Sequence, residues 1–291
     1  MTDKRNKRRN PILNMREFEL QHAEREVQLK NYMTTKRGRA AIDSATADTL
    51  KDQAALSLKA NATLARVEFA RALAAQAEKR AGEMKFPFFL TLAPAQFSMS
   101  IADAPRFDVE KIIVWGKRVL AMCDHVTFVE AALYTNFQAP GQNSRGAVHW
   151  HLHSVVWGDE YHASGIMGDM YGDPQPTFIP GLRLAHERPL SPDMVAGRFL
   201  YMAKAPLSEY RVYAQMKEIK DLTTGEVFEV PSGSYIQRKR ALRPGEASLL
   251  CRILGSRDLP SLTFAGGEGQ KLLLKALSKA RTAIGGKVAS L

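Results

Sequence analysis

Two strand-like runs lie near the middle of the chain. Residues 126–137 and 148–157 are rich in β-branched and aromatic side chains, and their apolar residues tend to alternate from one face to the other. A segment with Gly, Pro and Asn, residues 138–146, separates the two runs. Two such runs joined by a turn-rich loop predict an antiparallel pair of strands.

The remaining periodic segments predict helices on both sides of this pair, with a few more strands. A strand is expected at 86–94, and a hairpin at 211–230 around a Thr-Thr-Gly-Glu turn; helices are expected at 107–123, at 193–205 and from 271 to about 283. Residues 158–192 are rich in Gly and Pro and predict an irregular insertion. The pattern indicates an α+β fold with a central antiparallel sheet flanked by helices and preceded by a helical extension.

Composition divides the chain into four segments. Residues 1–40 contain two basic clusters and are expected to form a basic flexible arm. Residues 41–84 are rich in Ala, almost free of Gly and Pro, and predict the helical extension. The change to aromatic and β-branched residues near Lys85 predicts a catalytic core over 85–245, and 246–291 is expected to be a basic helical segment.

Charge points to a polyanionic partner. The 291 residues contain 41 Lys and Arg against 30 Asp and Glu, a formal net charge of +11. A basic surface attracts nucleic acid because binding releases counterions from the phosphates. Arg238, Lys239, Arg240 and Arg243 follow the predicted hairpin and are candidate phosphate contacts. A solvated basic surface without a specific partner is the alternative interpretation.

Several classes of protein are disfavoured by what the sequence contains. The two cysteines, Cys123 and Cys251, are far apart and form no CxxC pair, which argues against a zinc finger and a disulfide-stapled fold and favours a reducing cytoplasm. No run of about 18 apolar residues is present, and no apolar segment follows the basic N-terminus. We therefore expect neither a membrane partner nor a signal peptide.

The most informative motif is a row of three histidines in the second strand. His149, His151 and His153 alternate with apolar residues, so all three imidazoles share one face of the strand. Neutral imidazole is a frequent metal ligand, and histidines two residues apart can chelate one ion. The row therefore predicts a metal site, and a solvent-facing strand with inactive histidines is the alternative.

The neighbouring strand offers a third ligand. Val129, Ala131 and Leu133 lie on its apolar face, which puts Glu130 on the other face. If the apolar faces of the two strands coincide, Glu130 comes up opposite His151 or His153. Glu130 is thus a candidate metal ligand, and its alternative is an ordinary exposed strand glutamate.

A tyrosine and a lysine three residues apart supply a candidate nucleophile. Tyr201 and Lys204 fall at the end of a predicted helix, where positions i and i+3 share a face. The phenol can attack a phosphorus atom, and the ammonium can stabilise the negative charge that develops.

The order of three motifs resembles the HUH endonuclease superfamily, most closely its rolling-circle replication initiator (Rep) branch. The motifs are Phe89-Leu90-Thr91-Leu92, then His151-Leu152-His153, then Tyr201 with Lys204. The resemblance spans 86 to about 210 and implies a palm-like sheet with the histidine strand near its centre. The apolar run after His153 favours the pair His151 and His153 over His149 and His151.

The resemblance also implies a reaction and its partners. Tyr201 would nick single-stranded or extruded origin DNA of a plasmid or phage, form a 5′-phosphotyrosine and release a 3′-OH that primes synthesis. Mg²⁺ or Mn²⁺ would be held by His151, His153 and Glu130. The sequence has no GxxxxGK[ST] phosphate loop, so a host helicase and a single-strand binding protein are expected partners.

Other functions remain open at this point. Because Ala205 and Pro206 follow Lys204, the pattern indicates a single catalytic tyrosine, with Tyr210 and Tyr213 in structural roles. A mobilisation relaxase or a single-strand transposase would use the same chemistry, although the tyrosine follows the histidines here, which favours the Rep branch. A non-catalytic basic DNA-binding protein and a hydrolase that acts through water are the further alternatives.

Overall fold

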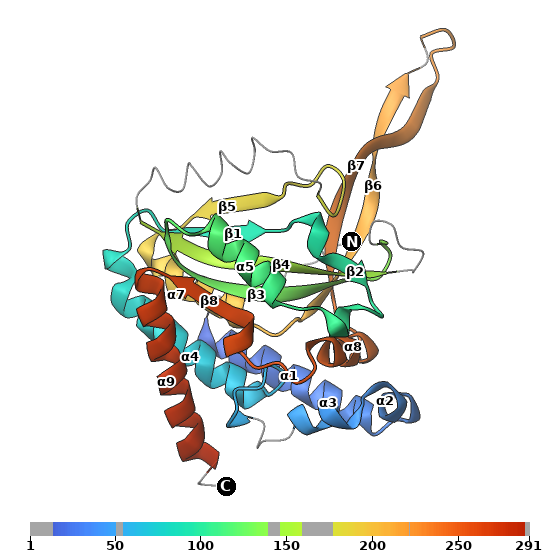
Figure 1. Cartoon of the computed structure of the whole chain (residues 1–291). Helices are drawn as coiled ribbons and strands as arrows, with labels where there is room; N and C mark the ends of the chain where they lie inside the picture. Colours follow the sequence, from blue (N-terminus) through green and yellow to red (C-terminus); the bar gives the residue numbers. More distant parts are fainter. Residues whose placement is uncertain (1–13, 51–54, 139–145, 159–176, 221, 289–291) are drawn as a thin grey trace, which may run out of the picture.

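The computed structural model describes residues 14–50, 55–138, 146–158, 177–220 and 222–288. Within them, an eight-stranded sheet has the order β5-β1-β4-β3-β6-β7, with β2 paired to β4 and β8 paired to β3 (Figure 1). The strands are β1 (Phe88–Leu92), β2 (Ser98–Ser100), β3 (Asp124–Tyr134), β4 (Ala147–Trp157), β5 (Ala185–Pro189), β6 (Ser208–Lys220), β7 (Val227–Ala241) and β8 (Thr263–Gly266). Every pairing is antiparallel except a short parallel contact between β3 and β6.

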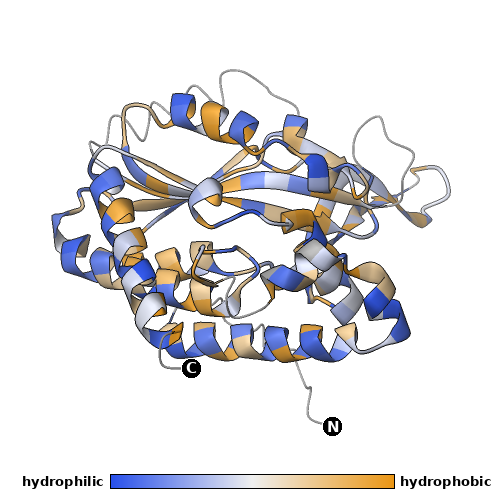
Figure 2. Ribbon diagram, turned by 60° about the horizontal axis from the view of Figure 1, so that its bottom comes forward, coloured by the Kyte–Doolittle hydropathy of each residue, from blue (hydrophilic) through white to orange (hydrophobic). Residues whose placement is uncertain are grey.

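Helices cover both faces of this sheet. They are α1 (Met15–Met33), α2 (Lys36–Ala41), α3 (Ser44–Thr49), α4 (Thr63–Arg80), α5 (Glu110–Val119), α7 (Pro192–Ala203), α8 (Pro244–Leu254) and α9 (Glu268–Val288). Helix α4 packs against both α7 and α9, and α1 packs against α4 and α8. In Figure 2 the long helices carry hydrophilic and hydrophobic residues in alternation, as expected for helices that bury one side. None of the described helices is long and apolar enough to cross a bilayer.

One face of the β3–β4 pair is apolar and lies against α5. Trp150 stacks on Phe107, with 5.2 Å between ring centroids. A Cβ atom added to Gly116 of α5 would lie 2.5 Å from the Cδ1 of Leu152 and 2.7 Å from the Cζ of Phe264. Glycine is therefore what allows α5 to approach the sheet this closely.

The opposite face of the same strands carries the histidines and lies against α4 and α7. Phe128 of β3 contacts Phe69 of α4, with ring centroids 5.9 Å apart, and His153 of β4 contacts Tyr201 of α7. All three histidines of the row are buried. The row is therefore not a solvent-facing strand, because helices that come from distant parts of the sequence cover it.

The predicted α+β class is confirmed, and so is the antiparallel pairing of the two central strands. Most expected elements are present, with shifted ends. The insertion contains a strand that we did not predict, β5, which pairs with β1 at the edge of the sheet. The hairpin is longer than expected, because β6 and β7 extend it well away from the body of the protein (Figure 1).

The prediction of a flexible arm over residues 1–40 is wrong from Met15 onward. Residues 15–33 form α1, which buries Phe18, His22, Arg25 and Leu29 along one side. Their separations of four, three and four residues follow the helical period. The basic clusters before and after this helix drew attention away from the stripe. The basic cluster at residues 4–9 lies outside the described residues. The proposed segment boundaries remain predictions.

Candidate functional site

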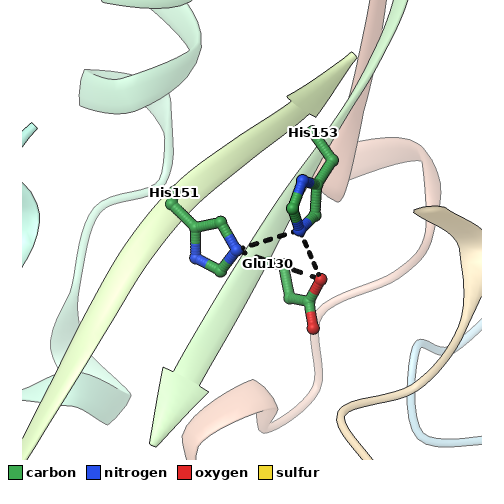
Figure 3. Close-up of side chains that lie close together, drawn as sticks. All are labelled: Glu130, His151 and His153. Carbon is green, nitrogen blue, oxygen red and sulfur yellow. Dashed lines mark hydrogen bonds and ion pairs between the residues drawn. The ribbon is translucent and has the colours of Figure 1, made fainter. Parts of the chain in front are cut away.

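Three predicted metal ligands come together on the histidine face of β3 and β4. Glu130 lies directly opposite His151 in the strand register, and His153 is the next residue on that face. The Nε2 of His153 lies 3.1 Å from Oε2 of Glu130 and 3.1 Å from the Nε2 of His151 (Figure 3). Their ligand atoms all lie within 4.8 Å of one another, and this buried group can hold a metal ion.

The hydrogen bonds around the two imidazoles suit a cation. Nδ1 of His151 lies 3.4 Å from the carbonyl oxygen of His149 and can donate a hydrogen bond to it. Nδ1 of His153 can likewise donate to Oγ1 of Thr91 at 2.9 Å. In these tautomers both Nε2 lone pairs converge on the Glu130 carboxylate. Three acceptors that face one another repel unless a positive charge lies between them, so the donor set fits a divalent ion.

The ionisation of these residues also suits ligation. Burial lowers the pKa of His151 and of His153, and for His151 the neighbouring His153 adds to the shift. Burial alone would raise the pKa of Glu130, but Lys204 and His153 outweigh it and hold that pKa well below its usual range. Both imidazoles are therefore neutral and the carboxylate is charged near neutral pH, which are the forms that bind metals.

His149 does not belong to this group. Its Nε2 lies 3.1 Å from the carbonyl oxygen of Pro94 and donates to it, and its ring packs on Phe178 with centroids 4.8 Å apart. Burial lowers its pKa to about 4. The register that pairs His151 with His153 is thus the one that the structure brings to Glu130, and the inclusion of His149 among the ligands is not supported, because its ring faces a different set of neighbours.

Lys204 reaches the same carboxylate from the end of α7. Its Nζ lies 2.8 Å from Oε1 and 2.7 Å from Oε2 of Glu130, and 4.3 Å from the centroid of the Tyr201 ring. The predicted pairing of Tyr201 and Lys204 on one side of a helix is therefore present. Lys204 links the candidate nucleophile to the candidate metal ligands.

Two buried residues of the N-terminal helices hold the backbone at Lys204. Arg66 of α4 donates from Nη1 to the carbonyl oxygens of Ala203, at 2.9 Å, and of Lys204, at 3.2 Å. The Nε2 of His22, from α1, accepts the backbone N–H of Ala205 at 2.9 Å. Sequence analysis missed both residues, because their partners lie 137 or more positions away along the chain.

Tyr201 lies between the metal ligands and the base of the hairpin. Its ring centroid is 5.5 Å from that of His153 and 5.7 Å from that of Phe89. Its hydroxyl accepts a hydrogen bond from the Nζ of Lys239, on β7, at 3.1 Å. Partial removal from water acts to lower the pKa of Lys239, but the oxygen of Tyr201 outweighs it and the pKa is raised. Lys239 therefore stays charged beside the phenol.

The four predicted phosphate contacts have different surroundings. Only Lys239 reaches Tyr201, whereas Arg238 is exposed and lies over the ring of Tyr213 at 5.6 Å. Arg240 forms ion pairs with Glu209 and with Glu246, the latter at 2.8 Å. Arg243 is exposed and directly precedes α8. Arg240 thus already has carboxylate partners within the protein.

Comparison with known protein families, with curated proteins and with solved structures found no match to this chain. What the chain does must therefore be argued from the geometry of the site alone.

Proposed function

We propose that the protein is a metal-dependent endonuclease that nicks single-stranded DNA through a covalent 5′-phosphotyrosine at Tyr201 and can rejoin the strand. Its biological role would be to start rolling-circle replication of a plasmid or phage, at an origin that is single-stranded or extruded. The same chemistry would serve a mobilisation relaxase or a single-strand transposase. Unwinding would then fall to a host helicase, with a host single-strand binding protein.

One observation carries this proposal. The Tyr201 hydroxyl is bonded to one ammonium, that of Lys239, and its ring lies under a second, that of Lys204. Lys204 in turn pairs with Glu130, which belongs to the group that can hold a metal. A phenol among cations beside a metal group is suited to phosphoryl transfer, since charge then builds up on oxygen atoms.

Each residue of the site would have its own role in the reaction. The oxygen of Tyr201 forms a bond to phosphorus, and the bond from phosphorus to the 3′ oxygen breaks. The phenol proton passes to solvent, which Tyr201 partly contacts, and the departing 3′ oxygen gains a proton. Lys239 and Lys204 stabilise the negative charge on the attacking and phosphate oxygens. The phosphotyrosine conserves the energy of the broken bond, so that a later 3′-OH can reverse the step without ATP.

A divalent ion at Glu130, His151 and His153 would polarise a phosphate oxygen. Two imidazoles with one carboxylate do not select strongly among divalent metals, so Mg²⁺ and Mn²⁺ both suit the site. The buried setting of the three residues would keep their positions fixed during the reaction.

The test is to incubate the protein with labelled single-stranded DNA and Mn²⁺, separate the products on a denaturing gel and identify any adduct by mass spectrometry. We expect a DNA-linked peptide that contains Tyr201, and its loss in Tyr201→Phe and in the presence of a chelator. Tyr32→Phe, a change in α1, is the matched control and should retain the adduct. Cleavage that persists in Tyr201→Phe would contradict the proposal and favour a water-mediated hydrolase. DNA binding with no cleavage of any substrate, the element's own origin included, would favour a non-catalytic DNA-binding protein.

A further inference from the structure

Helix α7 presents a third functional side chain on the face of Tyr201 and Lys204. Arg198 precedes Tyr201 by three residues, as Tyr201 precedes Lys204, and residues at this spacing share a helix face. The side chain of Arg198 is 5% exposed. Among the described residues it has no hydrogen-bond or ion-pair partner, and its buried Nε is unsatisfied. A buried guanidinium is normally bonded to a carboxylate, phosphate or carbonyl group, so this one has donors available for an anion.

The surroundings of Arg198 connect it to the reaction site. Its guanidinium carbon lies 5.4 Å from the centroid of the Phe89 ring. The same ring lies 5.3 Å from that of His153 and 5.7 Å from that of Tyr201. Phe89 is thus in contact with the candidate nucleophile, with a candidate metal ligand and with Arg198. A cation–π contact holds the guanidinium in place but leaves its N–H donors unpaired.

A second arginine lies close to the first. Arg188 of β5 is directly opposite Phe89 in the β1–β5 register, so its side chain projects from the same face of the sheet. Arg188 is exposed, and no carboxylate among the described residues pairs with it. The pKa of Arg198 is lowered, chiefly by burial and then by the positive charge of Arg188. Two neighbouring guanidinium groups without a carboxylate between them are complementary to an anion.

The position of this pair indicates which anion it binds. Planar guanidinium groups match the geometry of phosphate and can donate two hydrogen bonds to it. Arg188 lies on β5 and Lys239 on β7, which are the two outermost strands of the sheet. Tyr201 contacts Lys239 and also Phe89 of β1, a strand that lies between the outer two. A nucleic-acid strand that runs from the exposed Arg188 past the partly exposed Tyr201 to the exposed Lys239 would have one phosphate at Tyr201 and a neighbouring phosphate at the two arginines.

We infer that Arg198 and Arg188 form a subsite for a backbone phosphate of single-stranded DNA, adjacent to the phosphate that Tyr201 attacks. This inference rests on the proposed function for the identity of the strand. The subsite fixes the path of the DNA on the β5 side of the nucleophile, opposite to Lys239 and the hairpin.

The experiment measures binding without cleavage. The full chain, in a chelator, is titrated into a fluorescently labelled single-stranded oligonucleotide at several salt concentrations. Neutralisation of one phosphate contact should reduce the slope of log K against log[salt] by about 0.7. We expect this reduction in Arg198→Met and in Arg188→Gln, with weaker binding at low salt. Arg118→Gln removes an exposed charge from α5, on the opposite face of the sheet, and should leave the slope unchanged.

The outcomes separate this inference from the nuclease proposal. Unchanged slopes in both folded variants would overturn the subsite even if the wild-type protein forms the Tyr201 adduct. Reduced slopes would support it even if no adduct forms, in which case the nuclease proposal fails alone. If Arg198→Met does not fold, as judged by circular dichroism, the salt dependence of Arg188→Gln, a change at an exposed position, decides the test. An Arg198-dependent heat of binding with inorganic phosphate, together with unchanged DNA slopes, would assign the site to free phosphate and overturn the inference.

Discussion

The two faces of the β3–β4 pair are both buried, but only one of them is apolar. On the α5 side, Trp150 and Leu152 meet Phe107 and Gly116 in a close-packed contact. On the α7 side, the same strand carries three histidines, and β3 contributes a charged carboxylate. One sheet thus combines an ordinary core with a buried polar face.

This difference separates what holds the fold together from what the site can do. Burial of charge is costly unless the charge is paired, and Glu130 is paired with Lys204. Packing alone would place apolar residues at these positions. The polar face is therefore best explained by its chemistry, and changes on the two faces should have different consequences.

The largest difference is expected between two histidines of the same strand. His151→Gln removes a candidate ligand and should weaken Mn²⁺ binding by at least about 100-fold and abolish cleavage. His149→Gln is the matched change two residues before His151 on the same strand, and its amide can still donate to the carbonyl oxygen of Pro94. It should retain Mn²⁺ affinity. Titrations followed by electron paramagnetic resonance measure both, and equal losses would show that His149 is a ligand after all.

A change on the apolar face should affect stability and leave metal binding intact. Leu152→Ala creates a cavity beneath α5 and should lower the free energy of unfolding by about 2–5 kcal/mol. Urea denaturation gives this value, and Mn²⁺ titration of the folded fraction gives the affinity. A fall in affinity as large as that of His151→Gln would mean that the two faces are not independent.

The contacts from the N-terminal helices should influence both the stability of the protein and the rate of adduct formation. Arg66→Met leaves two buried carbonyl oxygens at Ala203 and Lys204 without donors, at a cost of about 2–4 kcal/mol of stability. Because Lys204 then shifts, we also expect slower adduct formation at saturating DNA with unchanged Mn²⁺ affinity. Arg71→Met is the matched control on α4, because it removes ion pairs with Glu19 and Glu68 that lie away from Lys204, and Glu68 keeps Lys287 as a partner. Similar kinetics for the two variants would argue against a positioning role for Arg66.

The smallest effect per residue is expected from pH. Burial lowers the pKa of His22 to about 3, with further contributions from Arg66 and Arg25, and that of His125 to about 4. Their folded-state pKa values lie below the unfolded value, so the unfolded state takes up protons first and stability falls as the pH decreases below about 6.5. Each should cost about 2 kcal/mol between pH 7 and pH 5.

Urea denaturation at several pH values measures this decline. Because His22→Gln removes one of the buried histidines whose pKa is lowered, the decline should be shallower in that variant than in the wild-type protein. A stability that is constant from pH 7 to pH 5 would contradict the assignment of both histidines as neutral and buried.

Much of the candidate site followed from local periodicity. The alternation in two strands placed Glu130 opposite His151 or His153, and the structure pairs it with His151. Helical spacing placed Lys204 on the side of Tyr201. These features need only the geometry of one strand pair and one helix. The α+β class followed in the same way.

What could not be predicted depends on contacts between distant segments. The histidine face is buried because α4 and α7 cover it, and Lys239 meets Tyr201 because β7 returns across the sheet. The unsatisfied Nε of Arg198 likewise depends on which groups surround it in three dimensions. A sequence pattern gives the face on which a residue lies but not what lies against that face.

A single measurement tests most directly whether the polar face is a metal centre. Crystals of the protein soaked in Mn²⁺ would be measured for anomalous scattering. We predict a peak within about 2.3 Å of the Nε2 atoms of His151 and His153 and of an oxygen of Glu130. A peak elsewhere with none at these three residues, or no peak at all at a Mn²⁺ concentration that supports cleavage, would contradict it.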